Sequence, residues 1–484
     1  MRELKPIPMA VVPPLDPDFV PAALWHRAFD EAARRLDGPV LEFAFVRPDG
    51  TCFRHSMRIL PHRSDTASLN LRAVERTLKF LLWMKGASRI LVAGCPQLAV
   101  ELGRIYSPTG ARAFDDDLIG RRVFLEHLSV EATDARALPP PNEPVVALGR
   151  NLDGCRIGFD LGGSDRKCAA VIDGQVVHSE EVPWSPYFEK DPIYHIEGVR
   201  DSLRRAAAHL PRVDAIGGSA AGVYIQNEPR VASLFRGVSP EEFERSIRPM
   251  FHRLRDEWNG VPFVVANDGE VTALAGSMAL GENAVLGVSM GTSVAAGWCD
   301  AAGHITTWLN ELAFVPVDYR DGAPADEWSG DVGCCVQYFS QQGVARLAAK
   351  AGISFPDATP AAERLVEVQR RMAAGDEAAL RIFETIGVCF GYALARFADF
   401  YPLRHVLVLG RVTSGAGGAV ILERATDVLR RQFPELAERL RLHTPDEQSK
   451  RHGQAIAAAS LPAIPCAPAS TEEALRLLSP RPFS

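Results

Sequence analysis

The chain of 484 residues lacks the features of several large protein classes. Its nine cysteines are odd in number, scattered and without a C-x-x-C pair, which favours a reduced cytoplasm over a disulfide framework. No apolar run reaches the roughly 18 residues of a membrane span, and the start MRELKPIPMAVVPPLDPDF has no apolar core of a signal peptide. The formal charge of −7 gives no overall bias toward nucleic acid or an anionic membrane.

Two common nucleotide-binding motifs are also missing. No segment fits G-x-x-x-x-G-K-[ST], which excludes a P-loop protein. No G-x-G-x-x-G follows a strand, which argues against a Rossmann dinucleotide site. What is present is ordinary globular material, 47% hydrophobic and 23% charged, with enough core for about two to four domains.

Residues 1–150 read as an α/β block. Helical patterns in PAALWHRAFDEAARRL, LNLRAVERTLKFLLWMKG and CPQLAVELGRIY accompany a hairpin, PVLEFAFVRPDGTCFRHSMRIL, and a short buried strand, RILVAG. The block ends at the proline-rich segment ALPPPNEPVV, which predicts a linker.

From Arg156 the pattern restarts. RIGFDLGGSDRKCAAVIDGQVV reads as strand, glycine turn, strand. Later strands in VDAIGGSAAGVYI, PFVVAND, AVLGVSMGTSVAAGW and HVLVLG alternate with helices, including a long helical region at about 343–401 and a last helix in KRHGQAIAAASL. This alternation predicts an α/β fold, and the early hairpins predict mixed sheets.

Three glycine-rich turns follow apolar strands, at Asp160–Ser164, Gly291–Ser293 and Gly410–Gly418. One such turn alone is usually only a turn. Exposed backbone N–H groups in turns of this kind can form anion-binding nests, and glycine allows a phosphate to approach. Three of them in one chain predict a phosphate-binding site.

The segment VVANDGEVTALAG places Asn267 and Asp268 where a strand ends and a helix begins. Asp268 has two interpretations. It can cap the helix by accepting backbone N–H bonds, or it can be a rigidly held general base for a hydroxyl.

Taken in order, D-x-G-G-S, N-D-x-x-x-x-A-L, M-G-T-S and V-L-G-x-x-x-S-G resemble the sugar kinases of the actin, hexokinase and Hsp70 superfamily. The match is best to the ROK (repressor, open reading frame, kinase) family and covers about residues 156–462. The resemblance implies an actin-like (ribonuclease H-like) two-lobed fold with mixed sheets. Residues 1–150 would be an added α/β domain, 151–275 the first lobe joined by a C-terminal helix at about 450–464, and 276–449 the second lobe.

The resemblance also implies a role for each matching residue. Asp268 would deprotonate the accepting hydroxyl, and Asp160 would hold Mg²⁺ through water. The sugar would contact Asn267, Glu311 and the segment Gly218, Ser219 and Ala220. The phosphates would face Gly162, Gly163, Ser164, Gly291, Thr292 and Ser293, and the adenosine would border Gly410, Ser414, Gly415 and Gly417.

The chain departs from the family in one segment, LNELAFVPVDYRDGAPADEWSGDVGCC. The family's sugar-contacting histidine falls at Phe314, which puts the usual hexose specificity in doubt. Two zinc cysteines of the family fall at Glu327 and Ser329, and only Cys334 is retained. Since structural zinc needs four N or S ligands, we expect no zinc site and interpret Cys334 and Cys335 as buried small residues.

The sequence therefore predicts an ATP-dependent carbohydrate kinase with ATP and Mg²⁺ as cofactors. The alternatives are a ROK-type sugar-responsive transcription regulator and a catalytically silent sugar-binding or nucleotide-binding protein. Small molecules are the expected partners, without nucleic acid or membrane, and a homodimer is left open. The sequence leaves the sugar, its hydroxyl and the choice between ATP and polyphosphate undetermined. The N-terminal block is expected to pack on the kinase as a lid or subunit contact.

Overall fold

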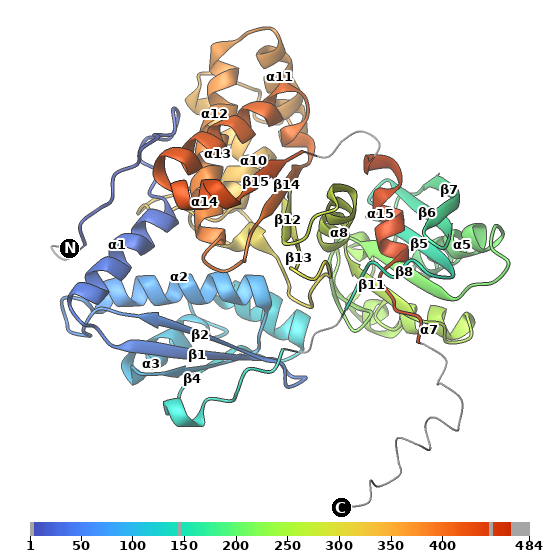
Figure 1. Cartoon of the computed structure of the whole chain (residues 1–484), viewed down its shortest axis with the longest axis horizontal. Helices are drawn as coiled ribbons and strands as arrows, with labels where there is room; N and C mark the ends of the chain where they lie inside the picture. The colour runs from blue at the N-terminus through green and yellow to red at the C-terminus, as the bar shows by residue number, and fades with distance from the viewer. Residues whose placement is uncertain (1–3, 144–146, 445–448, 466–484) are drawn as a thin grey trace, which may run out of the picture.

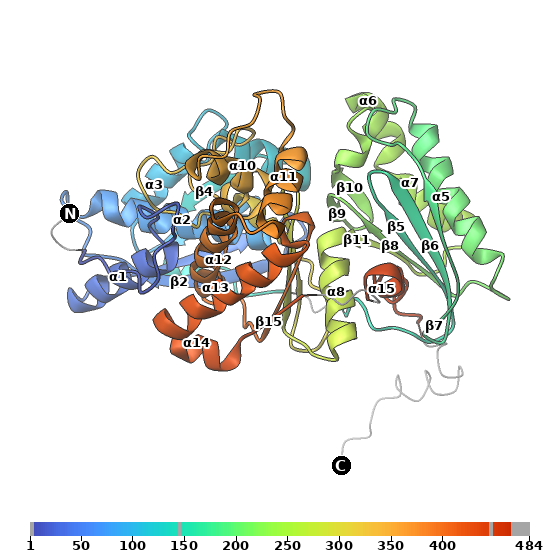
Figure 2. The same ribbon diagram turned by 90° about the horizontal axis from the view of Figure 1, so that it is seen from above.

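The computed structural model describes residues 4–143, 147–444 and 449–465. These residues form three larger sheets, one in the N-terminal block and one in each of two lobes, and a small two-stranded sheet. The first lobe lies at the right of Figure 1, while the N-terminal block lies below the helices of the second lobe. Seen from above in Figure 2, the N-terminal block and the second lobe overlap, and the first lobe stands apart from both.

The first-lobe sheet has the strand order β11-β8-β5-β6-β7. β5 pairs antiparallel with β6 and parallel with β8, so the sheet is mixed, as predicted. Three hairpin-linked strands lie to one side and two parallel strands to the other, which is the order expected of an actin-like lobe. The strands are β5 (Cys155–Leu161), β6 (Asp165–Ile172), β7 (Gln175–Pro183), β8 (Ala215–Ala220) and β11 (Phe263–Asn267).

One face of this sheet is covered by α5 (Pro192–Ala207) and α7 (Met250–Glu257), whose apolar side chains share a core with β5 and β8. An insertion between β8 and β11 forms a small hairpin and short helices. It consists of β9 (Val223–Ile225), β10 (Glu228–Val231), η3 (Ser233–Phe235), α6 (Pro240–Glu242) and η4 (Phe243–Ile247).

The second-lobe sheet has the order β13-β12-β14-β15, with β12 antiparallel to β13 and parallel to β14. Its helices stack above it in Figure 1, and α12 packs along α13. The strands are β12 (Val285–Met290), β13 (Val294–Cys299), β14 (His405–Leu409) and β15 (Arg441–His443). The helices are η5 (Leu312–Phe314), α9 (Val336–Phe339), α10 (Gln341–Lys350), α11 (Ala361–Ala373), α12 (Glu377–Phe397), η6 (Arg411–Thr413), α13 (Ala416–Gln432) and α14 (Pro434–Arg439).

The N-terminal block is a four-stranded sheet of order β2-β1-β3-β4 with helices beside it. The hairpin, the three helices and the strand at RILVAG that the sequence predicts for this block are confirmed. Helix α2 is terminated by Gly86, which has a positive φ of 81°. The elements are α1 (Ala22–Arg35), β1 (Val40–Val46), β2 (Cys52–Arg58), α2 (Ala67–Lys85), β3 (Arg89–Ala93), α3 (Pro96–Ile105), α4 (Ala113–Asp115), the π-helix η1 (Asp116–Phe124), β4 (Ser129–Ala132) and η2 (Ala135–Ala137).

The N-terminal block and the second lobe share one continuous hydrophobic core. Phe80 of α2 stacks on Phe400 with ring centroids 4.3 Å apart. Near the start of the chain, the buried Asp16 carboxylate binds Arg346 at 2.9 Å and Lys350 at 2.7 Å. Burial alone would raise the pKa of Asp16, but these cations lower it to about 2. The block is therefore built into the second lobe.

Two helices, α8 (Asp268–Leu280) and α15 (Ser449–Ala459), pack on each other between the lobe sheets (Figure 2). α15 lies on β5 and β8, and α8 lies on β12 and β13. The approach is close because glycines face the helices. A Cβ on Gly217 would lie 1.7 Å from the carbonyl oxygen of Ala458, and one on Gly297 would lie 2.1 Å from that of Gly269.

Two local features differ from the sequence interpretation, and a third concerns the charged residues after the first glycine turn. The first-lobe hairpin has a third strand, β7, after a turn at Asp173. The long helical region divides into α10, α11 and α12. Arg166, which follows the first glycine turn, is buried and binds Asp201 of α5 at 2.6 Å, while its neighbour Lys167 is partly exposed beside Asp165. Pro144–Val146 of the predicted linker lies outside the described residues.

Helix α12 is, by length and composition, apolar enough to cross a membrane, with a mean hydropathy of 1.4, although no such stretch was expected. Within the structure, 78% of this window is buried among other helices. Its apolar side chains therefore form part of the second-lobe core.

We predict that Gly217→Ala lowers the free energy of unfolding by about 1–3 kcal/mol, because the new methyl group overlaps the backbone of α15. The control is Gly453→Ala on α15, where the nearest atom is Ala275 Cβ at 3.8 Å. This change should be neutral or stabilise the helix by about 0.5–1 kcal/mol. Urea denaturation compares the two, and equal midpoints would contradict the close packing of α15.

Candidate active site

Asp268 is the first residue of α8, directly after β11. The helix cap is its neighbour Asn267, whose side-chain oxygen accepts a hydrogen bond from Gly269 N at 2.7 Å. Asp268 accepts from the same N–H at 2.9 Å. Capping is thus supplied by Asn267, and within the described residues no cation pairs with Asp268. A carboxylate held rigidly without a counter-ion is suited to accept a proton.

Asp160 and Glu311 each lie within electrostatic reach of Asp268. Burial raises the pKa of Asp268. Burial and then the Asp268 charge raise the pKa of Glu311 to about 7. Burial also raises the pKa of Asp160 to about 6, with Ser219 opposing the shift and Asp268 adding to it. The residues predicted as base, sugar ligand and metal ligand therefore meet at one place between the lobes.

Glu311 is positioned by the N-terminal block. Its backbone N–H donates to the carbonyl of Trp83 at 3.0 Å, and that of Asn310 donates to the carbonyl of Met84 at 2.9 Å. Both carbonyls belong to the last turn of α2. Helix α2 therefore fixes the segment that carries the predicted sugar ligand.

A fourth acid, Glu270, was missed by the sequence analysis. It lies on the first turn of α8 and accepts a hydrogen bond from Asn310 Nδ2 at 3.0 Å. Burial, with a further contribution from Glu311, raises its pKa to about 8. The only sequence signal was its place two residues after Asp268, which does not distinguish a buried acid from a solvated one.

Asp160 is the second-last residue of β5 and is held by the neighbouring strand β8. Ser219 Oγ donates to Asp160 Oδ1 at 2.7 Å, and Gln454 Nε2 donates to Ser219 Oγ at 3.1 Å. No group of three or more His, Cys, Asp or Glu residues that could hold a metal exists in the described ranges. A single carboxylate nevertheless fits Mg²⁺, which keeps most of its water ligands.

The predicted sugar segment is placed inside β8. Ser219 binds Asp160, Ala220 lies in the first-lobe core, and a Cβ on Gly218 would overlap the ring of Phe159. The residue next to Asn267 is instead Gly222, whose carbonyl accepts from Asn267 Nδ2 at 2.7 Å. Tyr224 is also close, since burial and the Asp268 charge raise its pKa.

The three glycine turns all follow strands that end at this place. Gly410, with φ of 103°, lies against the backbone of Met290, so the turns after β12 and β14 are adjacent. Gly291 N donates to Ser293 O at 2.9 Å and closes its turn, leaving Thr292 and Ser293 exposed. At the turn after β5, Gly163 lies against Tyr187, and Trp184 Nε1 donates to Gly162 O at 2.8 Å. Ser164 is exposed there.

A cavity of about 430 Å³ opens between α11 and the loop after β14. Leu365 and Val366 give it an apolar wall, and Ser414 lies opposite. Gln369 Nε2 joins the two sides by donating to Arg411 O at 2.8 Å. Of the other glycines predicted there, Gly415 starts α13 with φ of 68° and Gly417 packs against Phe383. A flat apolar ring such as a nucleobase fits between such walls.

Phe314, at the family's histidine position, belongs to an aromatic cluster. Its ring lies 4.3 Å from Trp83 and 5.5 Å from both Phe114 and Trp328. Cys334 and Cys335 are both buried, as predicted. The absence of zinc stays a prediction, which metal analysis of the purified protein would test.

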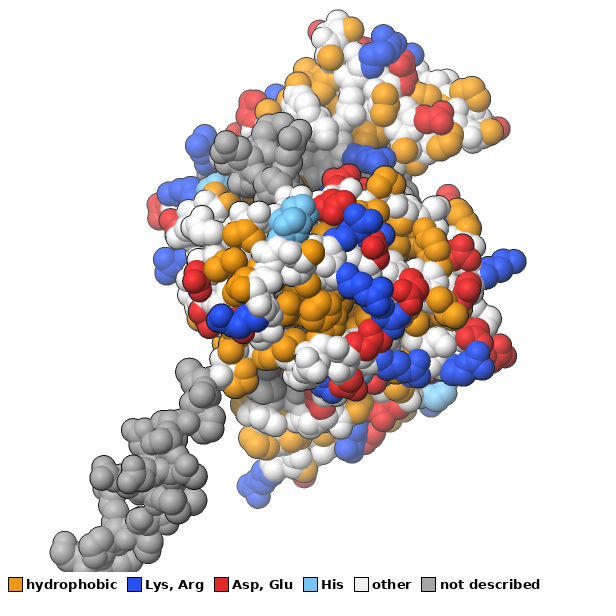
Figure 3. Space-filling model, turned by 90° about the vertical axis from the view of Figure 1, so that its right-hand side faces the viewer, with side chains coloured by type: hydrophobic (Ala, Val, Ile, Leu, Met, Phe, Trp, Pro, Cys, Tyr) orange, Lys and Arg blue, Asp and Glu red, His pale blue; other side chains and the backbone are white. Residues whose placement is uncertain are grey.

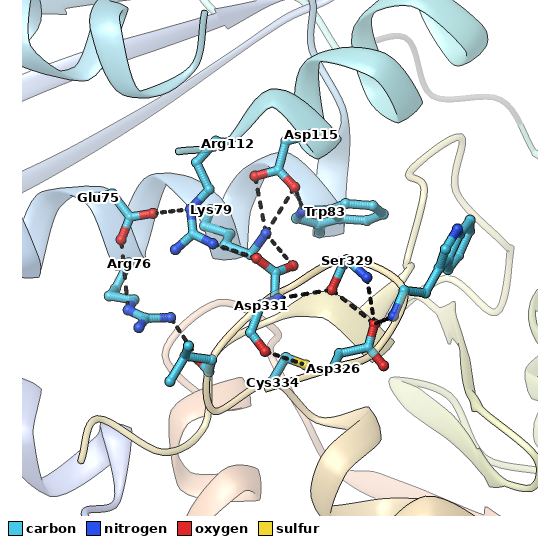
Figure 4. A network of polar contacts seen from close by, with 12 residues as sticks. Glu75, Arg76, Lys79, Trp83, Arg112, Asp115, Asp326, Ser329, Asp331 and Cys334 are labelled. Atoms are coloured by element: carbon cyan, nitrogen blue, oxygen red, sulfur yellow. Dashed lines mark hydrogen bonds and ion pairs between the residues drawn. The ribbon is translucent and has the colours of Figure 1, made fainter. Parts of the chain in front are cut away.

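An ionic network occupies the segment where the family has its zinc ligands (Figure 4). Lys79 of α2 lies 2.8 Å from both Asp115 and Asp331, and all three side chains are almost completely buried. Arg112 binds Asp331 and also Glu75. At the zinc-ligand position Ser329, the hydroxyl donates to Asp326 at 2.9 Å. Cations of the N-terminal block thus hold this loop in place.

No family model and no curated protein sequence matches the chain. Among solved structures, a ROK hexokinase from Thermus thermophilus shows 21% identity and a TM-score of 0.49 over 63% of this chain and 96% of that one. The chain is similar in structure to ROK proteins. A Streptomyces griseus ROK family glucokinase in complex with glucose and AMPPNP shows 19% identity and a TM-score of 0.46, over 63% of this chain and 98% of that one. A ROK family transcriptional regulator, a homolog of the E. coli MLC protein, shows 16% identity and a TM-score of 0.48, over 75% of this chain and 86% of that one. These TM-scores are all under 0.5, and the description of the fold therefore rests on the strand order of the chain itself.

Removing the central cation of the network should destabilise the protein strongly. We expect Lys79→Met to lower the free energy of unfolding by about 3–5 kcal/mol, because two buried carboxylates lose their shared partner. The control is Arg89→Gln, which breaks an exposed pair with Glu131 and should cost less than about 1 kcal/mol. Chemical denaturation measures both, and a Lys79→Met loss as small as that of the control would contradict a structural role.

Glu270 should make stability depend on pH. Its pKa is raised from 4.5 to about 8 on folding, so its contribution is fully present below pH 4.5 and is lost as the pH rises through 8. Glu270→Gln removes this loss. The difference in free energy of unfolding between Glu270→Gln and wild type should therefore be about 2–4 kcal/mol more favourable to the variant at pH 8.5 than at pH 5. Unfolding at both pH values is the measurement, with exposed Glu327→Gln as the control for a lost charge. If the difference in free energy of unfolding between Glu270→Gln and wild type were the same at both pH values, the predicted cost of ionising the buried Glu270 would be contradicted.

Proposed function

We propose that the protein is a carbohydrate kinase that transfers a phosphoryl group from ATP to a sugar hydroxyl, with Asp268 as the general base. The observation that carries the proposal is the meeting of Asp268, Glu311 and Asp160, from three elements, beside the glycine turns. Phosphoryl transfer requires a positioned nucleophile, a neutralised phosphate and in-line geometry. The proposed site provides a group for each requirement.

Asp268 would accept the proton of the attacking hydroxyl. Burial raises its pKa, which makes the carboxylate a stronger base, and the Asn267 cap and the adjoining β11 fix its position. Glu311 and Asn267 would orient the sugar by hydrogen bonds. Because Glu311 is attached to α2 through backbone contacts, its geometry is set before the sugar arrives.

The nucleotide would lie on the second lobe. The cavity beside α11 and Ser414 would take the adenosine, and the turns at Gly162–Ser164 and Gly291–Ser293 would face the phosphates. Asp160 would hold Mg²⁺ through water, and this ion would neutralise phosphate charge. Movement of the lobes about α8 and α15 would exclude water from the site.

The regulator alternative has less support. A recognition helix would be needed in the N-terminal block, where RILVAG forms β3 between β1 and β4. On the first-lobe face seen in Figure 3, Lys and Arg side chains are interspersed with Asp and Glu, without a basic stripe. The silent alternative depends on Phe314, which removes one predicted sugar contact but leaves Asp268 and Glu311 in place.

The direct test follows ADP release from Mg-ATP with a panel of hexoses, amino sugars, sugar acids and polyols. We expect Asp268→Asn to lower kcat by about 10²–10⁴-fold, because the base is lost, while nucleotide binding stays within about twofold. Asp256→Asn, an exposed change on α7, is the matched control.

Unchanged turnover in Asp268→Asn would eliminate Asp268 as the base, and no turnover with any acceptor would argue against a kinase. Replacing ATP with polyphosphate identifies the donor. Retention of the protein on a duplex DNA column at moderate salt would restore the regulator alternative.

A further inference from the structure

The four buried acids Asp160, Asp268, Glu270 and Glu311 form what we call the acid cluster. A second and larger cavity, of about 1030 Å³, is lined by other residues, and we call it the arginine cleft. Its walls come from η1 of the N-terminal block, from the insertion β10–η4 of the first lobe, and from the loop that carries Trp328. Five arginines and two carboxylates line it. The arginines are Arg121, Arg122, Arg230, Arg236 and Arg248, and the carboxylates are Asp117 and Glu244.

The cleft has more cationic groups than anionic ones to pair with them. Arg121 and Arg122 share Asp117, at 3.3 and 2.8 Å. Arg248 binds Glu244 at 2.5 Å. Within the described residues Arg236 has no ion pair, and its guanidinium lies 4.2 Å from the ring centroid of Tyr187.

Arg230 and Arg248 are unusual because they are mostly buried, at 11% and 18% side-chain exposure, and lie close together. Arg230 binds Glu228 at 2.9 Å through one nitrogen. Its Nε and Nη1, and Nε of Arg248, are buried without a hydrogen-bond partner in the described part of the chain. Burial and the Arg248 charge lower the pKa of Arg230, with Glu228 opposing them. Buried N–H groups without an acceptor are costly even on a guanidinium group that already has one ion pair.

Packing contacts connect the arginine cleft with the surroundings of Asp268. A Cβ on Gly222 would lie 2.4 Å from Val231 O, in the cleft wall, and the carbonyl of Gly222 accepts from Asn267, the neighbour of Asp268. Trp328, which lines the cleft, packs on Phe314, three residues after Glu311. The insertion and the Trp328 loop therefore each contribute to the cleft and contact a segment that carries one of the acids.

We propose that the acceptor sugar carries an oxyanion, a carboxylate or a phosphate, which the arginine cleft binds while a hydroxyl of the same molecule faces Asp268. Guanidinium groups present paired N–H donors that match these oxyanions, whereas a neutral hexose offers them no charge. Arg236, which has no ion pair within the described residues, and Arg121 and Arg122, which share a single carboxylate, have N–H groups available for this contact. That the bound anion belongs to an acceptor sugar rests on the proposed kinase function, whereas the binding of an anion in the arginine cleft does not.

The first experiment measures ADP release by the full-length protein with glucose, gluconate, glucuronate and glucose 6-phosphate. At least one anionic acceptor should exceed glucose in kcat/KM by about tenfold or more, because hydrogen bonds to charged groups are strong. The acid and phosphate arms identify which oxyanion is preferred. Equal or higher kcat/KM for glucose would overturn the inference and leave the kinase function intact.

The second experiment locates the contact. Arg230→Gln and Arg236→Gln should each raise KM for the anionic acceptor by about tenfold, with little change in kcat. Arg245→Gln, on the same insertion but exposed and outside the cleft, should leave both parameters unchanged. Two cleft variants are used because Arg236 can be replaced without breaking an ion pair. Unchanged KM in both folded variants would overturn the assignment.

Calorimetry with Asp268→Asn separates the two proposals, since binding needs no transfer. The variant should bind the anionic sugar, and Arg236→Gln added to it should weaken binding by about tenfold. Arginine-dependent binding of gluconate, glucose 6-phosphate or inorganic phosphate in a protein that never transfers phosphate would keep the anion site and refute the kinase. Absence of binding by all three probes at millimolar concentration would overturn the anion site itself.

Discussion

The buried contact of Lys79 with Asp115 and Asp331 is the constraint on which the candidate site depends. A lysine without solvent is stable only if carboxylates surround it, so α2 must stay against the loop after Glu311. The same helix fixes the Glu311 backbone through the carbonyl of Trp83. Charges supplied by the N-terminal block hold this loop in place, which gives the block a structural role beside the candidate site.

The acid cluster has the opposite character, since its carboxyl groups form no ion pair with any residue that the structure describes. Asp160, Glu270 and Glu311 have raised pKa values because each is buried and the groups repel one another. Such an arrangement reduces stability as the groups ionise. Its retention beside three glycine turns is better explained by chemistry than by folding. The rigid ionic network on one side of the site offsets the strain of unpaired charge on the other.

Local patterns in the sequence predicted most of the elements, and periodicity located α1, α2 and β3. The resemblance of the motifs pointed to Asp160, Asp268 and Glu311, whose roles stay predictions. The sequence could not show that α2 enters the second-lobe core, that Lys79 is buried, or that Glu270 lacks solvent. These properties arise from contacts between segments far apart in the chain. The five arginines were unremarkable in sequence for the same reason, since η1 and the insertion of the first lobe, which lie far apart in the chain, bring them together.

Separation of charge along the site connects these features. Carboxyl groups gather around Asp268, and guanidinium groups gather in the arginine cleft, with Trp328 and Phe314 forming an apolar wall alongside. A ligand with an anionic end and a hydroxyl end would be oriented by this field, because its charge is attracted to one end of the site and repelled from the other. Phe314 packs against Trp328 in this apolar wall. An oxyanion bound in the arginine cleft would fix the orientation of such a ligand without a polar side chain at position 314.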